Sequence, residues 1–150
     1  MTFPPYLTEL NLGEWNGTVA ELPPLPTGLR KLVIPFFRQS VRDLIHRLPI
    51  SLTEVSFGSR TCVDESLDDV DWPPLIRVLE FFYCVQPLIN WHPPASLETL
   101  NIGWTLPLSD LCLPATLQRL SFGFRELQSP IDASYCWPSH LRTLYLGQAF

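Results

Sequence analysis

The chain has 150 residues, 46% of them hydrophobic and 17% charged, which excludes a disordered protein and fits one domain over residues 1–150. The net charge of -5 arises from 10 basic and 15 acidic residues that form no long block, so a general nucleic-acid binder is disfavoured. Its apolar stretches are far shorter than the roughly 20 residues of a membrane helix, and we expect a soluble chain.

Seven ten-residue segments of the chain align with one another without a gap. Each copy has a proline, an aliphatic anchor three residues later, and apolar residues three and five positions after the anchor. In chain order the copies are residues 4–13, 26–35, 49–58, 73–82, 94–103, 114–123 and 138–147. The anchors are Leu7, Leu29, Leu52, Ile76, Leu97, Leu117 and Leu141, spaced by 20 to 24 residues. Apolar residues separated by one indicate a half-buried strand, so each copy predicts one short strand.

The residues that flank each predicted strand also recur. Glycine follows the strand in five copies, and we expect it there because it allows the positive φ of a sharp exit. These glycines are Gly13, Gly58, Gly103, Gly123 and Gly147, with Pro35 and Phe82 in the other two copies. A large apolar residue precedes the proline in six copies, and we expect this column to form the far wall of the core. Its members are Phe3, Leu25, Leu48, Trp72, Leu113 and Trp137.

About a dozen residues lead from each strand to the next repeat. In the second repeat, apolar residues at helical spacing predict a short helix that ends before Pro49. They are Val41, Leu44, Ile45 and Leu48. A shorter turn is expected over residues 66–70, and the proline-containing returns, such as those with Pro23 and Pro87, predict extended or 3-10 segments. The fold class predicted is an α/β solenoid of seven right-handed coils, with a parallel sheet on one face and mostly irregular or 3-10 returns.

The repeat resembles the FNIP-type leucine-rich repeats of social amoebae and large DNA viruses. The core of that unit, LP-x-x-L-x-x-L-x-L-G, matches here as LPISLTEVSFG, LPATLQRLSFG and WPSHLRTLYLG. The F-N-Q-P-I ending of the family has only partial matches, Gln86-Pro87-Leu88 and residues 128–131, and its F-N pair is missing. The resemblance implies a leucine-rich-repeat solenoid that binds or scaffolds and has no catalytic residue.

In such a coil the residues two and four positions after the anchor point outward from the sheet. The first outward row is Glu9, Lys31, Glu54, Val78, Thr99, Arg119 and Thr143. The second outward row is Asn11, Val33, Ser56, Glu80, Asn101, Ser121 and Tyr145. We call these fourteen side chains the outward face, which stacked repeats commonly use for binding. The alternative interpretation is a solvated sheet face without a partner.

The carboxyl-terminal part of the outward face is the expected partner site, because Trp104 and Tyr145 bring aromatic side chains close to it. The predicted site residues are Glu80, Thr99, Asn101, Trp104, Arg119, Ser121 and Tyr145. Trp104 belongs to a column of aromatic residues, with Phe36, Tyr83 and Phe124, that either continues the core or forms a partner patch. We expect a protein or peptide as partner, and neither nucleic acid nor a membrane.

Few residues elsewhere in the sequence suggest a catalytic or metal-binding site. The four cysteines, Cys62, Cys84, Cys112 and Cys136, lack the paired spacing of a zinc site. We expect reduced thiols in a cytoplasmic protein, with a disulfide framework as the alternative. Cys136 and His140 could be a nucleophile and its base or two metal ligands, but spacing places no third group beside them. The expectation is therefore no enzyme, no catalytic residue, no cofactor and no metal, with a structural spacer or an enzyme as alternatives.

The seventh repeat lies at the carboxyl end of the sequence. A solenoid needs terminal units with a polar outer face, and no such cap is visible after Leu146. We expect the last coil, with Leu141 and Leu144, to expose a strand edge. Either another chain stacks on it end to end, or the sequence is an excerpt of a longer array.

Overall fold

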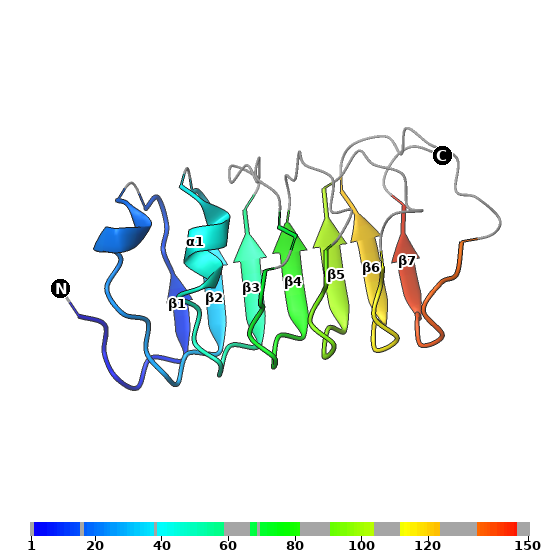
Figure 1. The fold of residues 1–150 in the computed structure, drawn as a ribbon, viewed down its shortest axis with the longest axis horizontal. Helices are drawn as coiled ribbons and strands as arrows, with labels where there is room; N and C mark the ends of the chain where they lie inside the picture. Colours follow the sequence, from blue (N-terminus) through cyan, green and yellow to red (C-terminus); the bar gives the residue numbers. More distant parts are fainter. Residues whose placement is uncertain are drawn as a thin grey trace.

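Seven parallel strands in chain order organise the structure. The computed structural model describes residues 2–15, 17–37, 39–58, 67–68, 70–81, 91–103, 112–123 and 135–146. Within them one sheet has the order β1-β2-β3-β4-β5-β6-β7 (Figure 1). The strands are β1 Glu9–Asn11, β2 Lys31–Ile34, β3 Glu54–Phe57, β4 Val78–Phe81, β5 Thr99–Ile102, β6 Arg119–Phe122 and β7 Thr143–Tyr145. The prediction of a solenoid with a parallel sheet and little helix is confirmed.

Strand pairing follows the alignment of the repeats residue for residue. Leu10 pairs with Leu32, which pairs with Val55, and the same register continues to Leu120 and Leu144. At the entry to each strand one carbonyl accepts two N–H groups of the next repeat. The Gln118 carbonyl, for example, accepts from the amides of Arg142 at 2.8 Å and Thr143 at 3.0 Å. These paired bonds fix the register before the strand begins.

The proline column begins a turn in all seven copies. The anchor N–H donates to the proline carbonyl at 3.0 to 3.3 Å in every copy. A proline disfavours helical backbone at the residue before it, so the chain is extended at the large apolar residue and the turn begins directly after it. Leu48 and Trp72 of this column lie in the core, and Phe3, Leu25, Leu113 and Trp137 pack against it. The predicted far wall of the core is confirmed.

Two short helices occur in the described returns. Helix α1, Val41–Ile45, is capped by Ser40, whose hydroxyl accepts from the amide of Asp43 at 3.0 Å. It buries Val41, Leu44 and Ile45 and ends before Pro49, as predicted. The 3-10 helix η1, Val19–Glu21, lies in the first return and confirms the expectation there. Of the turn expected over residues 66–70, only residues 67, 68 and 70 are described, with Leu67 and Val70 buried in the core, and the return with Pro87 lies outside the described residues.

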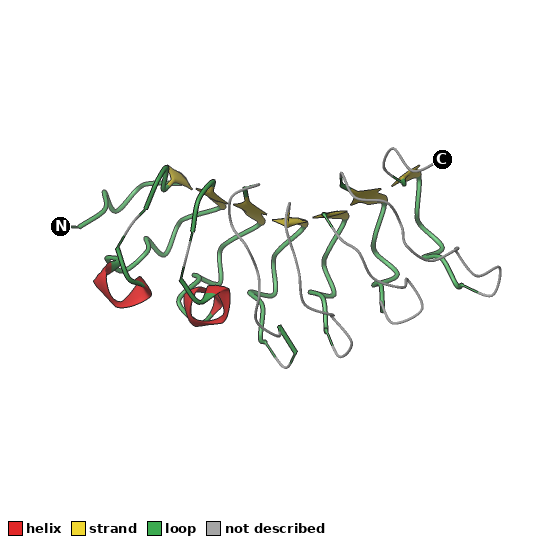
Figure 2. Cartoon of the chain, turned by 90° about the horizontal axis from the view of Figure 1, so that it is seen from above, coloured by secondary structure: helices red, strands yellow, loops and turns green. Residues whose placement is uncertain are grey.

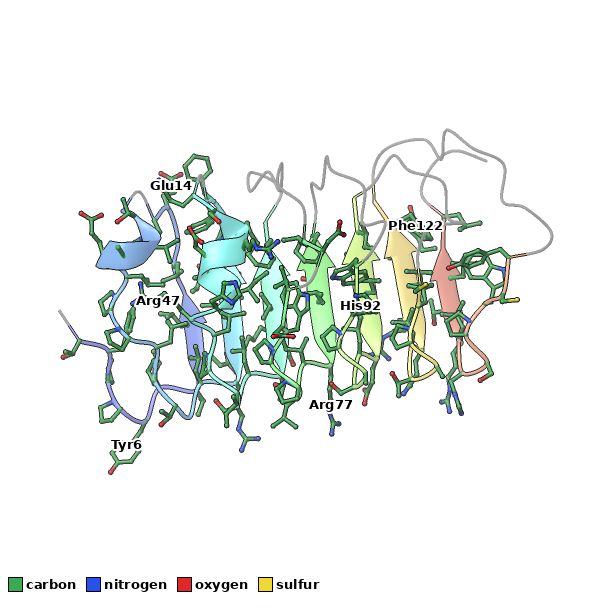
Figure 3. All side chains as sticks on the ribbon, in the orientation of Figure 1. Tyr6, Glu14, Arg47, Arg77, His92 and Phe122 are labelled. Atoms are coloured by element: carbon green, nitrogen blue, oxygen red, sulfur yellow. The ribbon has the colours of Figure 1, made fainter. Side chains whose placement is uncertain are left out.

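An arginine joins the first two returns. The guanidinium of Arg47, just after α1, donates to the carbonyl of Leu22 at 2.7 Å and to that of Val19 (Figure 3). Leu22 is the C-cap residue of η1, and the Val19 carbonyl also accepts the Leu22 amide at 3.2 Å. Arg47 thereby fixes the return of the first repeat against that of the second.

The core fills the space between the sheet and the returns. The anchor, and the residues three and five positions after it, are buried in repeats two to six; the rings of Phe57 and Phe81 stack at 5.1 Å. Burial falls at both ends of the array. Leu10 of β1 is only partly buried, Leu144 of β7 is 39% exposed, and Leu141 is partly buried. The exposed edge at β7 agrees with expectation, and end-to-end association stays a prediction.

The strand-exit glycines do not all serve the purpose predicted for them. Gly13 has a φ of 57°, as expected, whereas Gly58 and Gly123 do not have a positive φ. A Cβ on Gly58 would lie 2.5 Å from the carbonyl oxygen of Pro35, and one on Gly123 would lie 3.2 Å from the Cα of Gly103. At these two positions the conformational explanation is wrong. A side chain at Gly58 would collide with the backbone of the adjacent repeat, so glycine is needed there, whereas a Cβ at Gly123 would make a tight contact with Gly103.

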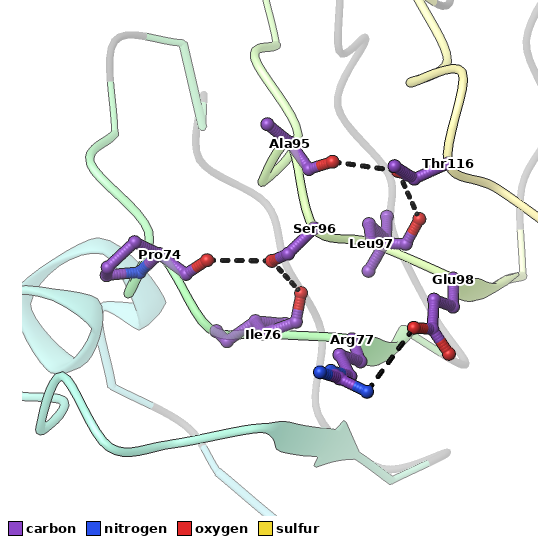
Figure 4. A network of polar contacts seen from close by, with 8 residues as sticks. All are labelled: Pro74, Ile76, Arg77, Ala95, Ser96, Leu97, Glu98 and Thr116. Carbon is purple, nitrogen blue, oxygen red and sulfur yellow. Dashed lines mark hydrogen bonds and ion pairs between the residues drawn. The ribbon is translucent and has the colours of Figure 1, made fainter.

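A hydrogen-bond ladder links successive turns through the residue just before the anchor (Figure 4). The Ser96 hydroxyl lies 2.7 Å from the carbonyl oxygens of both Pro74 and Ile76 in the preceding repeat. Further members at the same position continue the ladder. Thr116 Oγ1 lies 2.8 Å from Ala95 O and 2.9 Å from Leu97 O, and Ser51 Oγ lies 2.7 Å from Leu29 O. His140 Nδ1 lies 2.9 Å from Ala115 O. The ladder satisfies turn carbonyls that the strands leave unpaired.

Replacement of Thr116 by valine is expected to lower the free energy of unfolding by about 0.5–1.5 kcal/mol, because an isosteric side chain loses the ladder hydrogen bond. Urea denaturation measures the change. Thr8→Val is the matched control, since Thr8 is exposed and its side chain makes no hydrogen bond within the described part of the chain, and it should change stability by less than about 0.5 kcal/mol. Equal losses in the two variants would show that the ladder does not stabilise the array.

Candidate binding face

The outward face lies on the inner side of a curved molecule. Figure 2 shows the seven strands along a concave edge, with the returns spread on the convex side. In β2 to β5 the residues of the outward face are partly exposed and alternate with buried ones, which confirms the predicted orientation. None of the fourteen side chains is buried. The sheet therefore offers a continuous accessible surface from β1 to β7.

The amino-terminal half of the outward face is acidic. The Lys31 ammonium pairs with the Glu54 carboxylate at 3.0 Å, and this contact, with smaller contributions from Glu9 and Glu80, raises the pKa of Lys31. The Ser56 hydroxyl donates to the Glu80 carboxylate at 2.7 Å. The outward face of β1 to β4 thus carries three carboxylates, those of Glu9, Glu54 and Glu80, and one ammonium, that of Lys31. Of these charged residues only Glu80 is a predicted site residue, although the alternating charges of Glu9, Lys31 and Glu54 in the first outward row are visible in the sequence.

The carboxyl-terminal half of the outward face has a different character. Arg119 on β6 donates through Nε to the Thr99 hydroxyl on β5 at 3.1 Å. The other strand partner of Arg119 is Thr143 on β7. No carboxylate pairs with Arg119 among the residues that the structure describes. Its terminal nitrogens therefore retain donors for an anionic group.

Six of the seven predicted site residues lie on the outward face of β4 to β7. The register places them in two rows. Glu80, Asn101, Ser121 and Tyr145 are adjacent in one row, and Thr99 and Arg119 in the other. Tyr145 is 53% exposed, whereas Trp104 lies outside the described residues. The structure does not join Glu80 to Arg119, because each is hydrogen-bonded to its neighbour on the amino-terminal side.

The aromatic column after the strands is described at one position only. Phe36 is half-buried and forms a parallel bridge with Glu14, so it extends the pairing of the first two repeats. Tyr83, Trp104 and Phe124 lie outside the described ranges. The choice between core and partner patch therefore stays open for these three residues.

The other candidate catalytic or metal-binding residues do not form a cluster in the described ranges. They contain no group of three histidine, cysteine, aspartate or glutamate residues that could hold a metal ion. Cys112 and Cys136 are exposed thiols, and burial, with a smaller effect of these two thiols, raises the pKa of Tyr135 to about 12. His140 contacts the Ala115 carbonyl in the turn ladder. Cys62 and Cys84 lie in parts that are not described. No helix in the described parts is long and apolar enough to cross a membrane.

Comparison with known proteins does not assign the chain to a family. No protein-family model matches it, and no curated protein gives a match.

Proposed function

We propose that the protein is a non-enzymatic module that binds a protein or peptide on the outward face of its sheet. The observation that carries this proposal is the continuous accessible concave surface, on which Arg119 has no carboxylate partner among the described residues. Extended concave faces let stacked repeats contact a partner at several points. Arginine and tyrosine, here Arg119 and Tyr145, are also the residue types that contribute most to binding at interfaces.

We further propose that the array belongs to the leucine-rich-repeat class, with one right-handed coil for each of seven repeats, and that it resembles the FNIP type. The recurring proline, anchor and strand support this assignment, as do the seven proline turns with the same hydrogen bond. Parallel strands joined by a crossover are right-handed in almost all known sheets. A structural spacer is the competing role, and its outward face would tolerate charge reversal.

An affinity capture with three immobilised proteins tests the binding role. They are the wild type, the double variant Arg119→Glu/Tyr145→Ala, and the control Arg30→Glu/Tyr6→Ala. The control makes the same exchanges at exposed positions away from β5 to β7, since Tyr6 is 94% exposed and Arg30 precedes β2.

We expect a specific partner to be recovered equally by the wild type and the control, and about tenfold less by the Arg119 and Tyr145 variant. Quantitative mass spectrometry of the bound fraction measures this difference, and circular dichroism checks that all three proteins fold. Equal recovery of every partner by all three would contradict the site and favour the spacer.

A further inference from the structure

The seven proline turns lie side by side along the lower edge of the molecule in Figure 1. Three positions of every repeat are exposed or partly exposed there: the two residues between the proline and the anchor, and the residue after the anchor. We call these positions the turn edge, and the structure describes all of them. Every turn has the same hydrogen bond, and the strands that follow are in register. The turns therefore end at a similar level and form an extended, nearly straight edge.

Apolar side chains gather on the first four turns of this edge. Five large hydrophobic residues are exposed in the described part of the chain, and three of them are Tyr6, Ile50 and Leu75. These three are 94%, 76% and 54% exposed, and they do not belong to the core. At about 4.8 Å per repeat the four turns extend over about 14 Å. Exposed apolar residues that gather in one place are typical of an interaction surface.

The charge of the turn edge is opposite to that of the whole chain. The edge carries three arginines, Arg30, Arg77 and Arg142, and one carboxylate, that of Glu98. Glu98 pairs with Arg77 at 3.5 Å (Figure 4), so two positive charges remain on an edge of a chain whose net charge is -5. Figure 3 shows Arg77 projecting from the same lower edge as Tyr6. The turn edge thus combines exposed apolar residues with a local excess of positive charge.

Basic and apolar residues alternate along the first four turns. Tyr6 is in the first, Arg30 in the second, Ile50 in the third, and Leu75 with Arg77 in the fourth. An extended flat surface with negative charge at its boundary and an apolar layer beneath complements such a row. The surface of a membrane with anionic lipids has this structure, since lipid phosphates attract arginine, and tyrosine is enriched at the membrane–water interface.

The carboxylates nearest to this row belong to a different side of the molecule. Glu9 and Glu54 lie one residue beyond the turn edge, in the first outward row, and Lys31 pairs with Glu54. The strands run away from the turn edge in Figure 1, so the outward face stands approximately at right angles to a surface that the edge contacts. Contact along the edge would therefore leave the outward face accessible.

We propose that the turn edge of the first four repeats docks on the surface of a membrane that contains anionic lipids. Tyr6, Ile50 and Leu75 enter the interfacial layer, and Arg30 and Arg77 bind lipid phosphates. The expectation of no membrane partner rested on the lack of a long apolar stretch, and a contact with the membrane surface does not need one. This proposal is independent of the protein-binding function proposed for the outward face.

Cosedimentation of the whole chain with lipid vesicles tests the proposal. One set of vesicles contains equal amounts of phosphatidylcholine and phosphatidylserine, and phosphatidylcholine alone is the uncharged reference. The variant Tyr6→Ala/Arg30→Glu removes one apolar and one basic contact at exposed positions. Arg119→Glu/Tyr145→Ala is the matched control, because it makes the same two exchanges, with the same change of net charge, on the outward face.

We expect the wild type and the control to bind the mixed vesicles equally well and phosphatidylcholine alone weakly. Binding of Tyr6→Ala/Arg30→Glu to the mixed vesicles should fall by about tenfold or more, because an apolar and an electrostatic contact are lost. A second variant, Ile50→Ser/Leu75→Ser, keeps every charge and should bind about fivefold or more weakly through loss of apolar burial alone. Circular dichroism checks that each variant folds.

An acidic protein surface is the competing partner, and immobilised poly-glutamate is its probe. Retention of the wild type on poly-glutamate, without binding to vesicles, would overturn the lipid proposal. So would equal binding of the wild type to both kinds of vesicle, or unchanged binding of either turn-edge variant. A loss in Arg119→Glu/Tyr145→Ala as large as in Tyr6→Ala/Arg30→Glu would show that the turn edge is not the contact. Capture of a protein partner is a separate measurement, so failure of one proposal leaves the other distinguishable.

Discussion

Replacement of Leu100 by alanine is expected to lower the free energy of unfolding by about 2–5 kcal/mol. Leu100 is the central apolar residue of β5 and is completely buried between the equivalent leucines of β4 and β6. Its truncation leaves a cavity in contact with both neighbouring repeats, so the loss of contacts cannot be relieved by a movement of one repeat alone. Denaturation in urea, followed by circular dichroism, measures the change.

Leu144→Ala is the matched control, because Leu144 has the same position in β7 but is 39% exposed. Solvent already reaches its side chain, and we expect a loss below about 1 kcal/mol. Similar losses in the two variants would contradict the gradient of burial from the middle of the array to β7.

Gly58→Ala is expected to destabilise the protein by about 1–3 kcal/mol through overpacking. The added Cβ would lie 2.5 Å from the carbonyl oxygen and 2.6 Å from the Cα of Pro35. Both atoms belong to the backbone, so a rotamer change cannot relieve the contact. The exit of β3 from the sheet would have to move away from that of β2.

The control for this prediction is Gly28→Ala. A Cβ on Gly28 meets no atom within 4 Å, and the residue does not have a positive φ. Alanine there should stabilise the protein by about 0.4–1 kcal/mol, because it restricts the unfolded chain. Thermal and urea denaturation of both variants give the comparison. Destabilisation of equal size at the two positions would show that close contact with Pro35 is not the reason for Gly58.

The strands and their register could be predicted because the repeat pattern determines them together. Once the anchors are aligned, Leu10, Leu32 and Val55 occupy equivalent positions in their repeats and face the same core. The structure pairs Leu10 with Leu32 and Leu32 with Val55, as this alignment predicts. A slip by one residue would turn every apolar side chain of a strand outward. The outward placement of Glu80, Arg119 and Tyr145 follows from the same alternation.

Other features depend on distances that the pattern does not contain. Gly13 and Gly58 have the same position in the repeat, but only the first has a positive φ, and the second is constrained by Pro35. The inclination of Glu80 toward Ser56 is a choice of rotamer that spacing does not reveal. The turn ladder was visible as serine and threonine before the anchor in three repeats, yet its acceptors belong to neighbouring turns.

Each strand pairs only with the strands of adjacent repeats, and this arrangement has a consequence for local unfolding. In a quasi-one-dimensional array an end repeat can open without disturbing those beyond its neighbour. Opening should be easiest at β7, whose residues are all exposed, and at β1, which has no buried residue. A partner that contacts Arg119 on β6 and Tyr145 on β7 would hold the last strand to its neighbour, and would leave β1 as free to fray as before.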